Sequence, residues 1–110
     1  MREGKEAESK IFHIGDILSV TTSILVSPRY MDGLYELLRY LTGEEPAFES
    51  VPDVSARCRP YLVTQYPLLD QVDTDGITFE NWQEWLGDQK FLYGEWLRIE
   101  RPQAGEISIS

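Results

Sequence analysis

The residues best suited to acid–base chemistry are a histidine and an aspartate near the start of the chain. His13 is the only histidine, and Asp16 follows three residues later. An imidazole titrates near neutral pH, so this pair could transfer a proton. Any mechanism that needs two histidines is excluded. Because His13 lies between Ile11 and Ile14, we favour a partly buried, hydrogen-bonded histidine without a catalytic role.

The single cysteine, Cys58, is the second candidate. Its thiolate would be a nucleophile if His13 came close in the fold, and the neighbouring Arg57 and Arg59 would lower the thiol pKa. A lone cysteine on the apolar side of a helix more often fills the core, and we favour that interpretation. One cysteine also excludes an internal disulfide and fits a reducing cytoplasm.

The stretch DTDG (73–76) resembles the middle of a calcium-binding loop. If Gly76 is aligned with the obligatory glycine, however, Gln71 takes the first ligand position and Trp82 the last, where a bidentate glutamate belongs. A structural turn is therefore the better interpretation. One cysteine and one histidine do not suffice for a structural zinc site, and the glycines show no phosphate-binding pattern. We expect no catalytic residue, no metal and no cofactor.

Acidic charge is the strongest remaining signal. The chain has 19 acidic and 10 basic residues and a net charge of −9. Such a charge repels nucleic acid and anionic membranes and favours a partner with a basic surface, although it also serves solubility alone. If the acidic segments are neighbours, they form one negative face with salt-dependent binding. The candidate partner-binding residues are Glu44, Glu45, Glu49 and Asp53 in one segment, and Asp70, Asp73, Asp75 and Glu80 in another.

Two helices that would position these segments are predicted clearly. For the first, Ser27 is a good N-cap, Pro28 suits the first position and Gly43 ends the helix, which predicts a helix over 28–42. Thr78 caps the second helix, and Gly94 ends it. The apolar stripes that support the two helices are Met31, Leu34, Tyr35, Leu38 and Leu41, and Phe79, Trp82, Trp85, Leu86 and Tyr93.

Other elements are less sharply marked. The stretch 15–27 has the β-branched residues of a strand, but we favour a helix of one to two turns that Asp16 opens and that ends near Thr22. A helix is expected within 55–65, starting around 57–59 because Pro60 would otherwise lie deep inside it. Short strands are expected over 11–14 and 95–101.

The chain length suits one domain. We expect a leader over 1–10, a globular domain over 11–101 and a flexible tail over 102–110. The predicted fold class is α-rich α+β, with three or four helices packed on one aromatic core and at most one short two-stranded sheet; an all-α fold is the alternative. No apolar run spans a membrane and the first residues do not form a signal peptide, so we expect a cytoplasmic protein.

Several short motifs are similar to a family of small phage and prophage proteins. The likeness covers roughly residues 12–97. A glycine commonly follows the two threonines in that pattern, and Ser23 stands in its place here. The strongest matches are HIGDILSVTT (13–22), LVSPR (25–29), MDGLY (31–35) and YLTG (40–43), and the weaker ones are Cys58, YL (61–62), QYP (65–67), WL (85–86) and YGE (93–95).

This resemblance transfers no catalytic residue, but it implies a class of function. Small acidic phage proteins without cofactors are often inhibitors of host defence. The resemblance therefore implies an anti-CRISPR protein that binds basic residues of a CRISPR effector complex and blocks DNA recognition or nuclease recruitment. A non-enzymatic phage accessory or assembly protein is the alternative. An enzyme that uses His13 with Asp16 or Cys58 is the third hypothesis.

Overall fold

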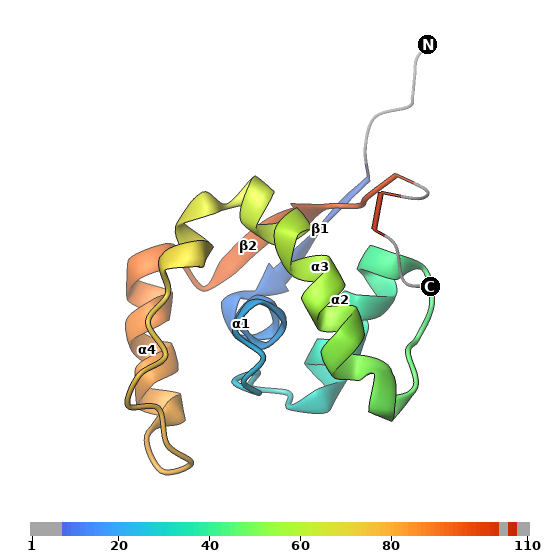
Figure 1. The fold of residues 1–110 in the computed structure, drawn as a ribbon. Helices are drawn as coiled ribbons and strands as arrows, with labels where there is room; N and C mark the ends of the chain where they lie inside the picture. The colour runs from blue at the N-terminus through green and yellow to red at the C-terminus, as the bar shows by residue number, and fades with distance from the viewer. Residues whose placement is uncertain (1–7, 104–105, 108–110) are drawn as a thin grey trace.

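Helix α1 (Ile14–Thr22) runs through the middle of the molecule and forms the centre of its core (Figure 1). The computed structural model describes residues 8–103 and 106–107. Eight of the nine α1 residues are buried. Because α1 is buried on nearly every side, its packing against other elements outweighs the strand propensity of its β-branched residues. The predicted short helix ending near Thr22 is confirmed, and it begins two residues before Asp16.

Three further helices surround α1. In Figure 1, α2 and α3 lie on one side of it and α4 lies on the other. Two short 3₁₀ helices, η1 and η2, precede and follow α3. The bounds are α2 (Met31–Thr42), η1 (Phe48–Ser50), α3 (Val51–Gln65), η2 (Pro67–Gln71) and α4 (Trp82–Tyr93).

Strands β1 (Ser9–His13) and β2 (Trp96–Glu100) form one antiparallel pair. Their register aligns Ser9 with Glu100 and His13 with Trp96. Side chains of α3 and of the residue after it cover the outer edge of β2, because the Tyr61 hydroxyl donates to the Glu100 carbonyl at 2.7 Å and the Tyr66 hydroxyl donates to the Arg98 carbonyl at 2.8 Å. These bonds occupy backbone groups that would otherwise be open to another strand. Four helices and one two-stranded sheet among the described residues confirm the predicted α-rich α+β class.

The buried core is mainly aliphatic, which differs from the expected aromatic core. Phe12 and Tyr40 are its buried rings, 5.2 Å apart between centroids. Trp82 and Trp85 are only partly buried, and Trp96 is 58% exposed. The tryptophans lie around the core because α1 already fills its centre with isoleucine, leucine and valine.

Two helix starts differ from the prediction. Helix α2 begins at Met31, because Ser27 and Pro28 belong to a turn in which the Tyr30 amide donates to the Ser27 carbonyl at 2.9 Å. Helix α3 begins earlier than expected, at Val51, and contains Pro60. Pro60 is exposed, so water can replace the hydrogen bond that its ring removes.

The predicted cap residue Thr78 lies four residues before the start of α4 and forms reciprocal hydrogen bonds with Asn81. Thr78 Oγ1 accepts from the Asn81 amide at 3.1 Å, and Asn81 Oδ1 accepts from the Thr78 amide at 2.7 Å. The expectation that Phe79 belongs to the apolar stripe is wrong, since it is 88% exposed in the turn before the helix. Only Leu86 and Gln89 of the twelve α4 residues are buried. The helix therefore leaves most of its surface open.

The expected leader and tail lie largely outside the described residues. Ser9 and Lys10, which the sequence assigned to the leader, belong to β1. In the expected tail, residues 102, 103, 106 and 107 are described, and Ile107 packs against the core.

Ser23 supports a stability prediction. It closes α1 in the left-handed region, with φ 63° and ψ 22°, where a side chain costs about 1–2 kcal/mol and glycine is unstrained. We expect Ser23→Gly to raise the free energy of unfolding by about 0.5–1 kcal/mol, after the extra freedom of glycine in the unfolded chain is subtracted. Urea denaturation measures this. Ser50→Gly, at a right-handed position with φ −92°, is the control and should give no gain; a gain of equal size there would contradict the explanation.

Candidate functional site

The carboxylate of Asp16 has internal partners. It is fully buried, and Ser27 Oγ donates to Oδ1 at 2.5 Å while Arg29 Nη2 approaches Oδ2 at 3.1 Å. A side chain at Gly33 would collide with Asp16 Oδ1 and Ser27 Oγ. Asp16 thus joins α1 to the turn before α2 and to the first turn of α2. Its role is structural.

The ion pair of Asp16 continues outward as a chain of alternating charges. Arg29 Nη1 lies 2.8 Å from Glu36 Oε1, and Lys10 Nζ lies 2.6 Å from Glu36 Oε2. The hydrogen bond from Lys10 is the largest cause that holds the pKa of Glu36 below its ordinary value. Hydrogen bonds to Glu36 and then to Asp16 raise the pKa of Arg29. These charges bind one another and connect β1 to α2.

His13 is buried and bonded on both sides of its ring. Nδ1 accepts from the Gly15 amide at 2.9 Å and caps α1, while Nε2 lies 3.3 Å from Glu95 Oε2. A ring that accepts at Nδ1 carries its proton on Nε2, toward Glu95. The hydrogen bonds of Asp16 go to Ser27 and Arg29, so the structure does not form the acid–base pair with His13. The interpretation of His13 as a buried, hydrogen-bonded residue is confirmed.

Cys58 is completely buried within α3. Burial disfavours the charged thiolate and raises the pKa of the thiol to about 12. This opposes the lowering that the flanking arginines suggested. The interpretation of Cys58 as a core residue is confirmed.

The DTDG stretch (73–76) is a turn, as predicted. Asp73 Oδ1 accepts from the Asp75 amide at 2.9 Å, and Gly76 has a φ of 85°. Trp85 Nε1 donates to the Asp73 carbonyl at 3.1 Å and ties the turn to α4. Within residues 8–103 and 106–107, no group of three or more His, Cys, Asp or Glu side chains is placed to hold a metal.

The two acidic segments do not form one face. The segment around 44–50 and the loop around 72–80 lie on opposite sides of the molecule in Figure 1. Arginines also offset part of their charge. The ion pairs are Arg39–Glu45 at 3.2 Å, Arg57–Asp53 at 2.9 Å and Arg59–Asp70 at 2.7 Å.

A surface that the sequence analysis missed lies along α4 and η2. Its apolar side chains are large and unusually open: Phe91 is 90% exposed, Leu92 65% and Leu68 59%. Between η2, the end of α4 and β2 there is a groove of about 250 Å³. The residues lining this groove are Gln65, Tyr66, Pro67, Leu68, Leu69, Leu92, Tyr93 and Leu97.

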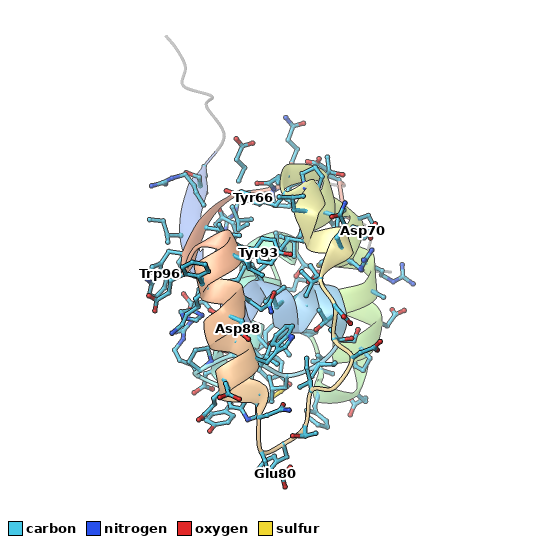
Figure 2. The ribbon with its side chains drawn as sticks, turned by 90° about the vertical axis from the view of Figure 1, so that its left-hand side faces the viewer. Tyr66, Asp70, Glu80, Asp88, Tyr93 and Trp96 are labelled. Atoms are coloured by element: carbon cyan, nitrogen blue, oxygen red, sulfur yellow. The ribbon has the colours of Figure 1, made fainter. Side chains whose placement is uncertain are left out.

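We call this the η2–α4 groove, and its lining contains no charged side chain. Figure 2 looks onto this side of the molecule and shows Tyr66 and Tyr93 with Asp88 below them and Asp70 toward the edge. Helical spacing places Asp88 and Leu92 on the same flank of α4. The sequence contained this signal for Phe91, which faces away from the predicted stripe, but not for Leu92, which lies seven residues after Trp85 and so shares its face.

The fold and this surface define a small α-rich α+β domain with large apolar side chains exposed on α4 and η2. The chain belongs to the family described as domain of unknown function DUF7736, whose model matches residues 12–72, more than half of the chain. The match runs from the end of β1 through η2, so α4 and β2 lie outside it. No curated protein and no solved structure matches the chain significantly. Among the described residues, no helix is long and apolar enough to cross a membrane.

Because Asp16 and Ser27 lie close to Gly33, whereas Gly87 has open space, alanine substitutions at the two glycines should change stability in opposite directions. Gly33→Ala places a methyl group against Asp16 Oδ1 and Ser27 Oγ, and we expect it to lower the free energy of unfolding by about 1–3 kcal/mol. Gly87→Ala, inside α4 with open space around its Cβ position, should raise it by about 0.5–1 kcal/mol. Urea denaturation of both variants is the measurement. Equal effects of the two changes would contradict the role assigned to Asp16.

The raised pKa of Cys58 predicts a protected thiol. At pH 8 its thiolate fraction should be roughly a thousandfold lower than in the unfolded chain, so iodoacetamide should modify it only in urea. The same shift contributes stability that is complete below about pH 9 and is lost as the pH rises toward 12, because the folded state holds the proton more tightly. The positive control is Ser50→Cys combined with Cys58→Ala, which exposes the thiol. Rapid modification of folded wild-type protein would restore the nucleophile hypothesis.

Proposed function

We propose that this chain is a protein-binding module without enzymatic activity and that its partner presents a basic surface. The observation that carries the proposal is the set of large apolar side chains exposed on α4 and η2, which are Phe91, Leu92 and Leu68. The net charge of −9 favours a partner of opposite charge. Contiguous apolar surface with a polar rim is typical of protein interfaces.

The use of the reactive residues supports the same proposal. Asp16 is bonded to Ser27, His13 caps α1, and Cys58 is buried as a neutral thiol. Each of these three side chains, which are the candidates for catalysis in the sequence, thus has a structural role in the fold. Binding is the function left to the outer surface.

The more specific form of the proposal is an inhibitor from a phage that binds a CRISPR effector complex. Its support is the sequence resemblance to phage proteins together with the net charge of −9. Carboxylates on the surface would compete with DNA phosphates for lysine and arginine side chains and so block DNA recognition or nuclease recruitment. The attraction would act over about 10 Å at 0.1 M salt, so binding would weaken as salt increases.

Affinity purification tests the proposed function. Tagged protein is used to capture partners from a bacterial lysate that contains a CRISPR effector, at 0.05 and 0.3 M salt. We expect a specific partner that is released at high salt, and capture that falls at least about tenfold when Asp70 and Asp88 are changed to lysine. Reversal of Glu44, Glu45 and Glu49 should have a smaller effect, because this segment lies on the opposite side of the molecule.

The identity of the captured partner also distinguishes the CRISPR inhibitor from a phage accessory or assembly protein. Capture of an effector subunit with loss of CRISPR interference in cells would support the inhibitor. Capture of virion proteins would favour a phage accessory or assembly protein. Failure to capture any salt-sensitive partner would overturn the proposed function.

A further inference from the structure

We infer that two copies of this chain pair through the outer edge of β1, the edge that faces away from β2, so that their sheets join into one antiparallel sheet of four strands. In Figure 2 the blue strand β1 lies at the left-hand border of the ribbon, with β2 and α4 on its inner side. The inference does not depend on the proposed function, because β1 contributes no residue to the η2–α4 groove.

The bonds between the two strands show which backbone groups of β1 point outward. The Arg101 amide donates to the Glu8 carbonyl at 2.7 Å, and the Ile14 amide donates to the Glu95 carbonyl at 2.8 Å. Hydrogen-bonded and non-hydrogen-bonded residues alternate along an antiparallel pair, so the even-numbered residues of β1 bond to β2. The odd-numbered residues direct their amides and carbonyls away from β2, and these are Ser9, Ile11 and His13.

The two edges of the sheet differ in how their backbone groups are used. On the outer edge of β2, side chains of α3 and of Tyr66 bond to the backbone of Arg98 and Glu100. On the outer edge of β1, the backbone groups of Ser9 and Ile11 have no hydrogen-bond partner among the described residues. A row of open amides and carbonyls is matched by another extended strand. The occupant of this edge is therefore a β-strand.

The lysine that could protect this edge is directed elsewhere. Lysines on edge strands commonly keep other strands away by their charge. Here Lys10 Nζ lies 2.6 Å from Glu36 Oε2 of α2 and 5.3 Å from the centre of the Phe12 ring. The neighbouring Glu8 is paired with Arg101 at 2.8 Å. A second copy would therefore meet an edge whose nearest charges are already neutralised, despite the negative net charge of the whole chain.

The edge is complementary to itself when two copies pair about Ile11. A two-fold axis at this position places Ile11 opposite the same residue of the second copy. Both isoleucines are 49% exposed in the single chain, and they would cover each other as a cross-strand pair. An axis at Lys10 would instead place two lysines opposite each other, which is unfavourable. The side chains thus select one register.

Charges across the pair favour the same register. Arg98 Nη1 donates to Ser9 Oγ at 3.0 Å, so its guanidinium extends over β1, and no ion pair joins Arg98 to a carboxylate among the described residues. In the register about position 11, Ser9 faces His13 of the second copy. The His13 ring lies 3.3 Å from Glu95, whose side chain is 48% exposed. Each Arg98 therefore approaches Glu95 of the other copy, and the two-fold axis forms this contact twice.

Sedimentation velocity of the intact purified chain tests for the dimer. One pair of five-residue strands forms a small interface, so we expect a weak dimer that is half formed at roughly 10–100 µM protein. Concentrations from well below to well above this range are measured at 0.15 M salt. A chain that remains monomeric throughout would overturn the inference, including in the case where the edge accepts a strand of a different protein.

Proline at position 11 tests the role of the backbone. The Ile11 amide points away from β2, so Ile11→Pro removes no bond within the sheet and the chain should keep its circular dichroism spectrum. It removes a donor from the pair of copies, and we expect self-association at least about tenfold weaker. Ile11→Val keeps the amide and most of the side chain, and is the control that should dimerise like the wild type. Equal dimerisation of Ile11→Pro and Ile11→Val would contradict the inference.

Cysteine cross-linking tests the register without requiring a disruptive change. Ile11→Cys combined with Cys58→Ala places two thiols on opposite strands at the two-fold axis, within the separation that a disulfide spans. Under oxidised glutathione it should form covalent dimers at least about tenfold faster than Phe48→Cys in the same background, because Phe48 is 71% exposed on η1, away from the edge. Equal rates would show that the dimer, if present, forms through another surface, and would overturn the inference.

Discussion

The buried carboxylate of Asp16 is the interaction on which the rest of the structure depends. Burial of an ionised group without partners is costly, and here Ser27 and Arg29 supply the hydrogen bonds that make it tolerable. The closeness of these groups leaves no room for a side chain at Gly33, so α2 must cross α1 at this point. The central helix, the turn before α2 and the start of α2 are therefore fixed by one polar contact inside an apolar core.

The sequence was sufficient for elements whose signals are local. The helix that ends at Gly43 and the turn at Gly76 follow from spacing and turn residues. The roles of Asp16 and Ser27 could not be obtained in this way, because their bond joins residues eleven positions apart. Ser27 was assigned as a helix cap because a cap and a buried hydrogen-bond donor have the same local sequence. Pro60 likewise was expected to exclude a longer helix, and only its exposed position shows why α3 continues through it.

The groove could be predicted only in part, and for a similar reason. A ring or leucine on a helix is normally taken as a core residue, yet α1 already fills the centre of this molecule. Phe91 and Leu92 are left outside, and helical spacing indicates this beforehand only for Phe91, because Leu92 lies seven residues after Trp85 and shares its face. The acidic segments were also readable one by one, but their separation on opposite sides depends on the tertiary fold. The apolar side chains that are exposed to a partner are therefore those that the tertiary fold leaves outside the core around α1.

The pairing of β1 with β2 has a consequence for synthesis of the protein. The register aligns Ser9 with Glu100, so β1 has no strand partner until residues 96–100 have left the ribosome. Phe12 of β1, by contrast, packs against Tyr40 of α2, which is synthesised much earlier than β2. Contacts between distant positions form late in folding because long loops must close first. The nascent chain therefore passes through a stage with its N-terminal segment unpaired, during which chaperones or proteases can reach it.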